Sequence, residues 1–148
     1  MKSGLLFLVT LLFMNAGFAQ KVKDGKDFMY YEKYESAKSV FEKILVSDPS
    51  NEEAIYWLGQ AFIGLDNVQA AKKLYLEKLQ ENPNSPLVMV GVGHVELIED
   101  KKADARNHFE TAISLSKGKS IDVLNAVGYA NSNINSKNGD AAYAIQKL

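Results

Sequence analysis

The sequence predicts an all-α fold built from repeated helix pairs. Apolar residues recur at steps of three and four, which is the spacing of one helical face. No stretch alternates with a period of two for long enough to form a strand. The chain has only 3 prolines, so long uninterrupted helices are expected. Its 148 residues are 47% hydrophobic and 24% charged, which is the composition of an ordinary globular domain.

Composition and charge exclude several classes of function. The formal net charge is −1, so the chain lacks the basic excess of a nucleic-acid-binding protein. It has no cysteine, which excludes thiolate metal sites, iron–sulfur clusters, cysteine nucleophiles and anchoring through a lipid-modified cysteine. We therefore expect no metal, no cofactor and no nucleic-acid partner.

Residues 1–19 have the layout of a secretory signal peptide. Lys2 supplies the positive region, an apolar run of about eleven residues follows, and small residues occupy the −3 and −1 positions, Gly17 and Ala19. The other interpretations are a membrane anchor or a buried helix, but a spanning helix needs about 20 apolar residues. We expect cleavage between Ala19 and Gln20, no transmembrane segment afterwards, and a location in the periplasm or at the outer envelope.

Helix boundaries can be assigned along residues 20–148. The first amphipathic helix is expected over 34–46, and helices from residues 54 and 70 follow the cap signals Ser50-Asn51-Glu52-Glu53 and Asp66-Asn67-Val68-Gln69. Further caps are expected from three residues: Ser85 before Pro86, Asp100 before 101–115, and Ser120 before 121–130. Residues 131–138 are expected to form a loop. Gly139 and Asp140 then open a last helix that reaches Leu148 and presents Ala141, Ala144, Ile145 and Leu148 on one face.

Three classes of residue repeat in one register of 34 residues. They are the small residues Gly25, Gly59 and Gly93 with Ala37, Ala71 and Ala105; the aromatics Phe41, Tyr75 and Phe109; and the prolines Pro49 and Pro83. Packing explains the pattern. A small residue on the first helix of a pair allows the second helix to approach closely, and a small alanine on the second helix meets it. The aromatic is expected to fill the space between this pair and the next, and proline ends the second helix.

In these positions the chain resembles the tetratricopeptide repeat (TPR) family. The signature residues are Gly25, Phe28, Ala37, Phe41 and Pro49 in the first repeat; Leu58, Gly59, Phe62, Ala71, Tyr75 and Pro83 in the second; Gly93, Ala105, Phe109 and Ala112 in the third; and Val127, Gly128 and Ala130 in the fourth. The resemblance implies antiparallel helix-turn-helix repeats stacked as a right-handed solenoid of about 3.5–4 repeats. The expected repeats are 20–51, 52–85, 86–119 and an incomplete 120–148.

Some positions depart from the family pattern. Ile55 stands where a tryptophan is expected, Glu96 stands where an aromatic is usual, and the fourth repeat has a longer loop between its helices. The Ala-Gln cleavage site together with this style of repeat looks like envelope proteins of Bacteroidetes-type bacteria.

The resemblance also implies a concave groove lined by the first helix of each pair. Mapped onto this sequence, the groove residues are Met29; Glu53, Tyr56, Gln60 and Ile63; Leu87, Val90, His94 and Leu97; and Asp122, Asn125, Tyr129 and Ser132. A mostly apolar groove of this kind suits a peptide or a partner protein. The alternative is that another segment of the same chain covers part of the strip.

No motif for catalysis is found. His94 and His108 are the only histidines, and we expect one to face the groove and the other to be solvated. The acidic pair Glu99-Asp100 is expected to form a solvated turn. We expect a non-catalytic interaction scaffold of the cell envelope. The alternative is the N-terminal recognition module of a longer protein with further, possibly enzymatic, domains, because no polar capping helix follows Leu148.

Overall fold

The computed structural model describes residues 21–147. The expected signal peptide, its cleavage site at Ala19 and Gln20, and Leu148 lie outside the described residues. All regular structure within 21–147 is helical, as the sequence predicts, and it divides into two compact units, one ending at Leu65 and the other beginning at Asp66.

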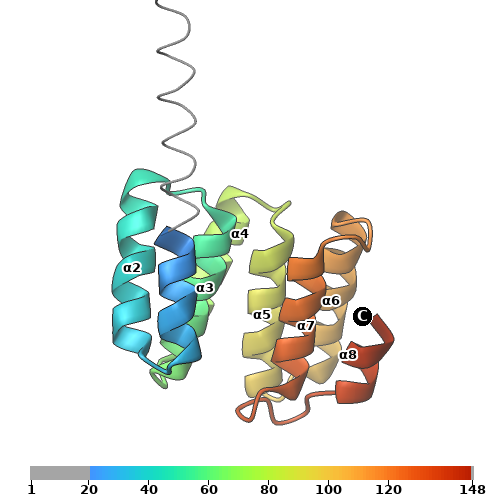
Figure 1. The fold of residues 1–148 in the computed structure, drawn as a ribbon. Helices are drawn as coiled ribbons and strands as arrows, with labels where there is room; N and C mark the ends of the chain where they lie inside the picture. Colours follow the sequence, from blue (N-terminus) through green and yellow to red (C-terminus); the bar gives the residue numbers. More distant parts are fainter. Residues whose placement is uncertain (1–20, 148) are drawn as a thin grey trace, which may run out of the picture. The chain divides into compact units, whose positions relative to one another are not determined.

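The first unit contains a helical stretch over residues 21–30 and two further helices, α2 (Tyr34–Ser47) and α3 (Glu52–Gly64). The second unit contains α4 (Val68–Glu81), α5 (Pro86–Ile98), α6 (Lys102–Leu115), α7 (Ile121–Ser132) and α8 (Ala141–Lys147) (Figure 1). The expected helices all occur, and most of their ends agree with the sequence to within two residues.

Side chains cap α3, α4 and α7, and the expected cap Ser120 of α7 is confirmed. The caps of α3 and α4 lie one residue after Ser50 and Asp66, where the two cap signals begin. Ser85 stands at the N-cap of α5 as expected, but its side chain makes no cap bond. Asn51 accepts a hydrogen bond from the Ala54 amide at 3.0 Å, and Asn67 accepts one from the Ala70 amide at 3.2 Å. Ser120 caps α7 in the same way through the Val123 amide, at 3.3 Å. Each cap satisfies an N–H group that has no partner inside its own helix.

The expectation that Asp100 caps α6 is wrong. Asp100 has φ 66°, in the left-handed region, and the N-cap of α6 is Lys101, which makes no side-chain cap. The Asp100 carboxylate instead accepts a hydrogen bond from the Asn138 side-chain amide, which belongs to the loop before α8. The connection between α5 and α6 has three residues, and its middle residue adopts the left-handed conformation. Aspartate tolerates that conformation.

Glycine and aromatic side chains meet within each unit, but not all of them as expected. A Cβ added at Gly25 would lie 2.5 Å from the Phe41 ring, and a Cβ added at Gly93 would lie 2.5 Å from the Phe109 ring. Both rings are buried. Phe41 and Phe109 therefore cover the glycine of their own repeat, which corrects the expectation that the aromatics fill the space between one helix pair and the next. Tyr75 does meet the next pair, where it covers Gly91.

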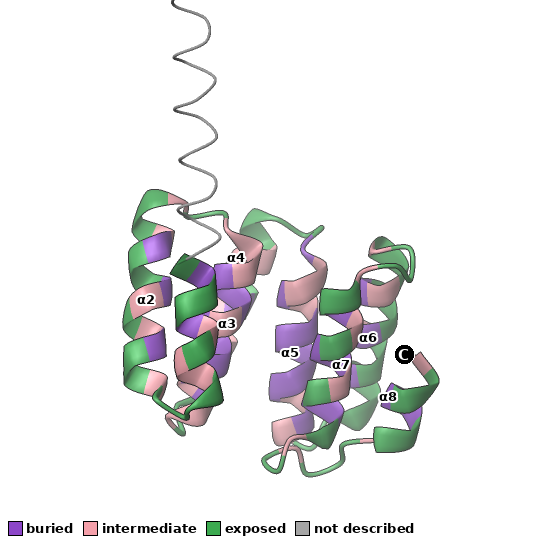
Figure 2. Cartoon of the chain, viewed as in Figure 1, coloured by how far each residue is buried: buried purple, intermediate pink, exposed green. Residues whose placement is uncertain are grey.

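Helix α5 is the centre of the second unit. It packs against α4, α6 and α7, and eight of its residues are buried, from Val88 to Leu97 (Figure 2). The neighbouring helices bury only a stripe each. This pattern explains why α5 is apolar around most of its circumference whereas α4 and α6 are amphipathic.

The last helix contacts two others. It packs on α7, and its Tyr143 ring stacks on Phe109 of α6, with ring centroids 6.5 Å apart. The guanidinium of Arg106 on α6 lies 4.2 Å from the Tyr143 ring centroid. It also pairs with the Asp140 carboxylate at 2.9 Å. Tyr143 therefore joins α8 to α6, a role that its position in the sequence did not reveal.

Candidate functional site

Within the first unit, most of the expected groove residues are buried. Tyr56, Gln60 and Ile63 are at most 3% exposed. Glu53 is partly exposed and accepts a hydrogen bond from Lys26 at 2.9 Å, and Met29 is also partly exposed. These side chains offer little free apolar surface for a ligand.

Within the second unit, burial separates the expected groove residues into two groups. Val90, His94 and Leu97 of α5 are buried, and Leu87 is half-buried. Asp122, Asn125, Tyr129 and Ser132 of α7 are exposed. The His94 ring meets the Tyr129 ring edge-on with centroids 5.8 Å apart, so α7 lies directly against this face of α5.

A groove of about 340 Å³ lies between α7 and α8. Its lining is largely apolar and consists of Asn125, Gly128, Tyr129, Ser132, Ala141, Ala144 and Ile145. Tyr129 is 45% exposed and Ile145 is 72% exposed. The groove thus combines expected groove positions on α7 with residues of α8 that the groove expectation omitted. The apolar spacing of α8 was the signal that could have placed them there.

The two helices that form this groove are held in place by Asn131. Its side-chain amide donates to the Val127 carbonyl at 2.9 Å, and its side-chain oxygen accepts from the Asp140 backbone amide at 3.0 Å. Asp140 then caps α8 by accepting from the Tyr143 amide at 2.9 Å. A Cβ at Gly139 would collide with the Asn131 carbonyl, so only glycine allows this close approach. The contact between α7 and α8 is therefore fixed despite the long loop.

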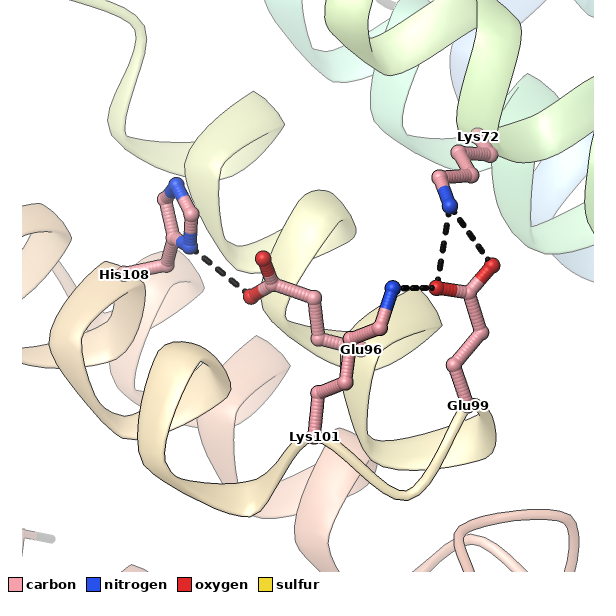
Figure 3. Close-up of polar contacts among 5 residues, drawn as sticks. All are labelled: Lys72, Glu96, Glu99, Lys101 and His108. Carbon is pink, nitrogen blue, oxygen red and sulfur yellow. Dashed lines mark hydrogen bonds and ion pairs between the residues drawn. The ribbon is translucent and has the colours of Figure 1, made fainter.

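Charged residues form a cluster at the C-terminal end of α5. Lys72 reaches both carboxylate oxygens of Glu99, at 2.8 and 2.9 Å, and Lys101 reaches the same carboxylate at 2.7 Å (Figure 3). His108 of α6 lies 2.8 Å from Glu96. Two expectations are corrected here, because Glu99 is ion-paired rather than solvated, and His108 is half-buried against a carboxylate.

The charges of this cluster compensate one another. Hydrogen bonds from Lys101 and Lys72 lower the pKa of Glu99, and the hydrogen bond with Glu96 raises the pKa of His108. Glu99 thus has two cationic neighbours, and Glu96 is paired with the His108 ring (Figure 3). Within residues 21–147, no group of three or more His, Asp or Glu side chains is placed to hold a metal ion. The arrangement is suited to fixing α4, α5 and α6 together.

The comparisons with known proteins agree with this architecture. The described helices define a helical-repeat protein, and residues 29–89 match the family model described as Tetratricopeptide repeat. The matched stretch contains α2, α3 and α4 and the start of α5. Tetratricopeptide repeats generally mediate protein–protein interaction, and the family is typically non-catalytic. No curated protein matches the chain. None of the helices within 21–147 has the length and hydrophobicity needed to cross a membrane.

Proposed function

We propose that the protein is a non-catalytic scaffold of a bacterial cell envelope, which binds a partner protein through its helical repeats. The observation that carries the proposal is the open groove between α7 and α8, whose lining is mostly apolar and includes two large exposed side chains, Tyr129 and Ile145. Exposed apolar surface of this kind is costly in a protein that has no use for it, and it marks interaction sites.

The envelope location is supported by residues 1–19. Their order of positive, apolar and small residues is that of an export signal, and Ala19 stands where the signal peptidase cuts. The absence of cysteine suits an oxidising compartment and leaves no residue for lipid anchoring. The resemblance to envelope proteins of Bacteroidetes-type bacteria supports the same location.

Site-specific photocrosslinking tests the binding function. A photoreactive amino acid is placed at Tyr129 in the groove, or at Leu115 of α6 as a control of nearly equal exposure, 42% against 45%. We expect a discrete crosslinked protein in the envelope fraction from position 129, with no such product from position 115. Identical products from both positions, or none from 129, would contradict the proposal.

A further inference from the structure

The chain itself shows what fills a groove between paired helices. Aligning the N-caps Ser85 of α5 and Ser120 of α7 places three pairs of residues in equivalent positions: Val90 with Asn125, His94 with Tyr129, and Leu97 with Ser132. The α5 member of each pair is buried, whereas the α7 member is exposed. The difference follows from α7 itself, which lies against α5 and contacts α6.

The second helices of the two pairs correspond in the same way. Aligning the N-cap Lys101 of α6 with Asp140 of α8 places Ala144 in the position of Ala105. Both alanines are buried. The α7–α8 groove therefore continues the interface by which α7 docks on the α5–α6 pair. It presents the same small residue on its second helix.

The buried face of α7 is made of small aliphatic side chains. Val123, Ala126, Val127 and Ala130 are the apolar residues of α7 that are at most 5% exposed, and they recur at steps of three and four. Residues of this size allow two helices to approach closely. A helix that docks in the α7–α8 groove needs a similar face.

A second copy of this chain offers no such face from α7. Its small aliphatic residues are already buried within the second unit, where α7 packs on α5, α6 and α8, and the exposed positions of α7 include Asn125 and Tyr129. The occupant must therefore come from a different segment.

We propose that the α7–α8 groove docks an amphipathic helix of a partner protein, which presents alanine and valine with the spacing of Val123, Ala126, Val127 and Ala130. This inference rests on the proposed scaffold function and names the kind of partner that the groove accepts. The partner helix lies against Tyr129 and Ile145 as α7 lies against α5.

A defined peptide provides the test. The probe copies residues 120–132 and carries a hydrocarbon link between positions 125 and 132, which are exposed on α7 and lie two helical turns apart. The link is needed because a free helix of this length is marginal in water. It is labelled with a fluorophore and titrated with the purified protein while anisotropy is measured. The control peptide carries Ala126→Asp and Ala130→Asp. We expect saturable binding of the probe and none of the control.

Two protein variants locate the binding site. Ile145→Asp places a charge in the groove, and Ile134→Asp makes the same change on a side chain that is 97% exposed and absent from the groove lining. We expect Ile145→Asp to weaken binding by at least about tenfold and Ile134→Asp by less than about twofold. Tyr129→Glu is a second groove variant, and it should act as Ile145→Asp does.

Three results would overturn the inference. They are no saturable binding up to about 1 mM probe, equal effects of the two isoleucine variants, or a dimer of the protein alone that Ile145→Asp abolishes. In the last case the groove is filled by a second copy. If the peptide does not bind but a crosslinked product forms from position 129, the scaffold function stands and only this partner class is wrong. If the peptide does not bind and no crosslinked product forms, the proposed function is wrong as well.

Discussion

Gly93 lies where the second unit is most tightly packed, because the Phe109 ring covers it. Gly93→Ala would bring a Cβ to 2.5 Å from that ring, and Phe109 is only 1% exposed, so it has little room to move. We expect the variant to lose about 1–3 kcal/mol of stability, the usual cost of overpacking. Urea denaturation of the variant and the parent measures the difference.

The matched control is a smaller partner ring. Phe109→Leu in the Gly93→Ala background makes space for the added methyl group, so the two substitutions should cost less together than the sum of their separate costs. Strictly additive losses would show that Gly93 and Phe109 do not press on each other.

The two histidines give the stability a maximum near pH 6.5. Burial lowers the pKa of His94 to about 4. As the pH falls below 6.5, His94 is therefore protonated in the unfolded chain while it stays neutral in the folded protein. Stability is then lost between pH 6.5 and about 4, by about 3 kcal/mol in total. The raised pKa of His108 acts in the opposite sense, because its contribution is complete below pH 6.5 and is lost as the pH rises through its folded pKa.

Chemical denaturation at a series of pH values separates the two histidines. His94→Phe should remove the loss between pH 6.5 and 4.5, and His108→Gln should remove the decline above pH 6.5. Glu99, Glu110 and Asp140 have lowered pKa values, so their losses fall below their ordinary values of 4.5, 4.5 and 3.8. A parent protein whose stability is flat from pH 4.5 to 8 would rule out both assignments.

At the residue scale, the repeat register predicted positions better than it predicted packing partners. The 34-residue spacing placed the glycines and the aromatics in register, but Phe41 and Phe109 cover the glycine of their own helix pair, not the space between one pair and the next. The environments of His94 and His108 depend on which helix packs against each face, and spacing does not contain that information. Sequence analysis therefore did not predict that His94 is buried or that His108 is half-buried against Glu96.

At the scale of elements, α8 depends on one aromatic anchor. Its 7 residues are too few to be stable alone, and Tyr143 provides its stacking on Phe109 and its contact with Arg106. Tyr143→Ala should release α8, so the amides of residues 144–147 should exchange with solvent as fast as those of a free peptide. Amides of α5 should keep their protection.

The control for this experiment is Ile145→Ala on the same helix. Ile145 is mostly exposed and takes no part in the stacking, so its loss should change exchange in α8 very little. Hydrogen exchange followed by mass spectrometry compares the two variants with the parent. Slow exchange of α8 in Tyr143→Ala would show that the contact with α7 is sufficient by itself.

The helix caps show how far the sequence specified the elements. Ser120 was predicted as a cap because it precedes an apolar helical run, and its bond is local to four residues. The signals before α3 and α4 located the helix starts, but the side chains that cap them, Asn51 and Asn67, lie one residue after the first residue of each signal. Asp100 carries a similar local signal but bonds to Asn138, 38 residues away. A partner that distant becomes available only after α6 and the loop before α8 have come together, so no local pattern indicates it.

At the scale of the whole molecule, the candidate site was only half predicted. The tetratricopeptide resemblance indicated Asn125 and Tyr129, which line the α7–α8 groove, and it treated the buried residues Val90, His94 and Leu97 as equivalent to them. Which members of a repeated position stay exposed depends on where the stacking of helix pairs stops. That is a property of the assembled unit, and each repeat alone carries no sign of it.

Export is the prediction that concerns the chain as a whole. The signal features of residues 1–19 predict that the protein isolated from its native envelope fraction begins at Gln20. Intact-mass measurement of that fraction tests the cleavage site directly. Lys2→Glu with Leu8→Arg removes both the positive and the apolar feature, and it should retain the uncleaved chain in the cytoplasm. Recovery of the parent protein as a full-length cytoplasmic chain would contradict the prediction.

The Asn131 side chain has a consequence for engineering the molecule. Because it ties the end of α7 to the start of α8, the loop of residues 133–138 does not set how these helices meet, and doubling a loop costs only about 0.6 kcal/mol. A short epitope tag inserted between Ser136 and Lys137 leaves the hydrogen bonds of Asn135 and Ser136 in place, so it should be tolerated with a loss below about 1 kcal/mol. Asn131→Ala should cost about 1–3 kcal/mol, since it leaves the Asp140 amide without its acceptor. The same loop thus offers a permissive attachment point for a reporter beside the α7–α8 groove, and thermal unfolding of the tagged protein checks it.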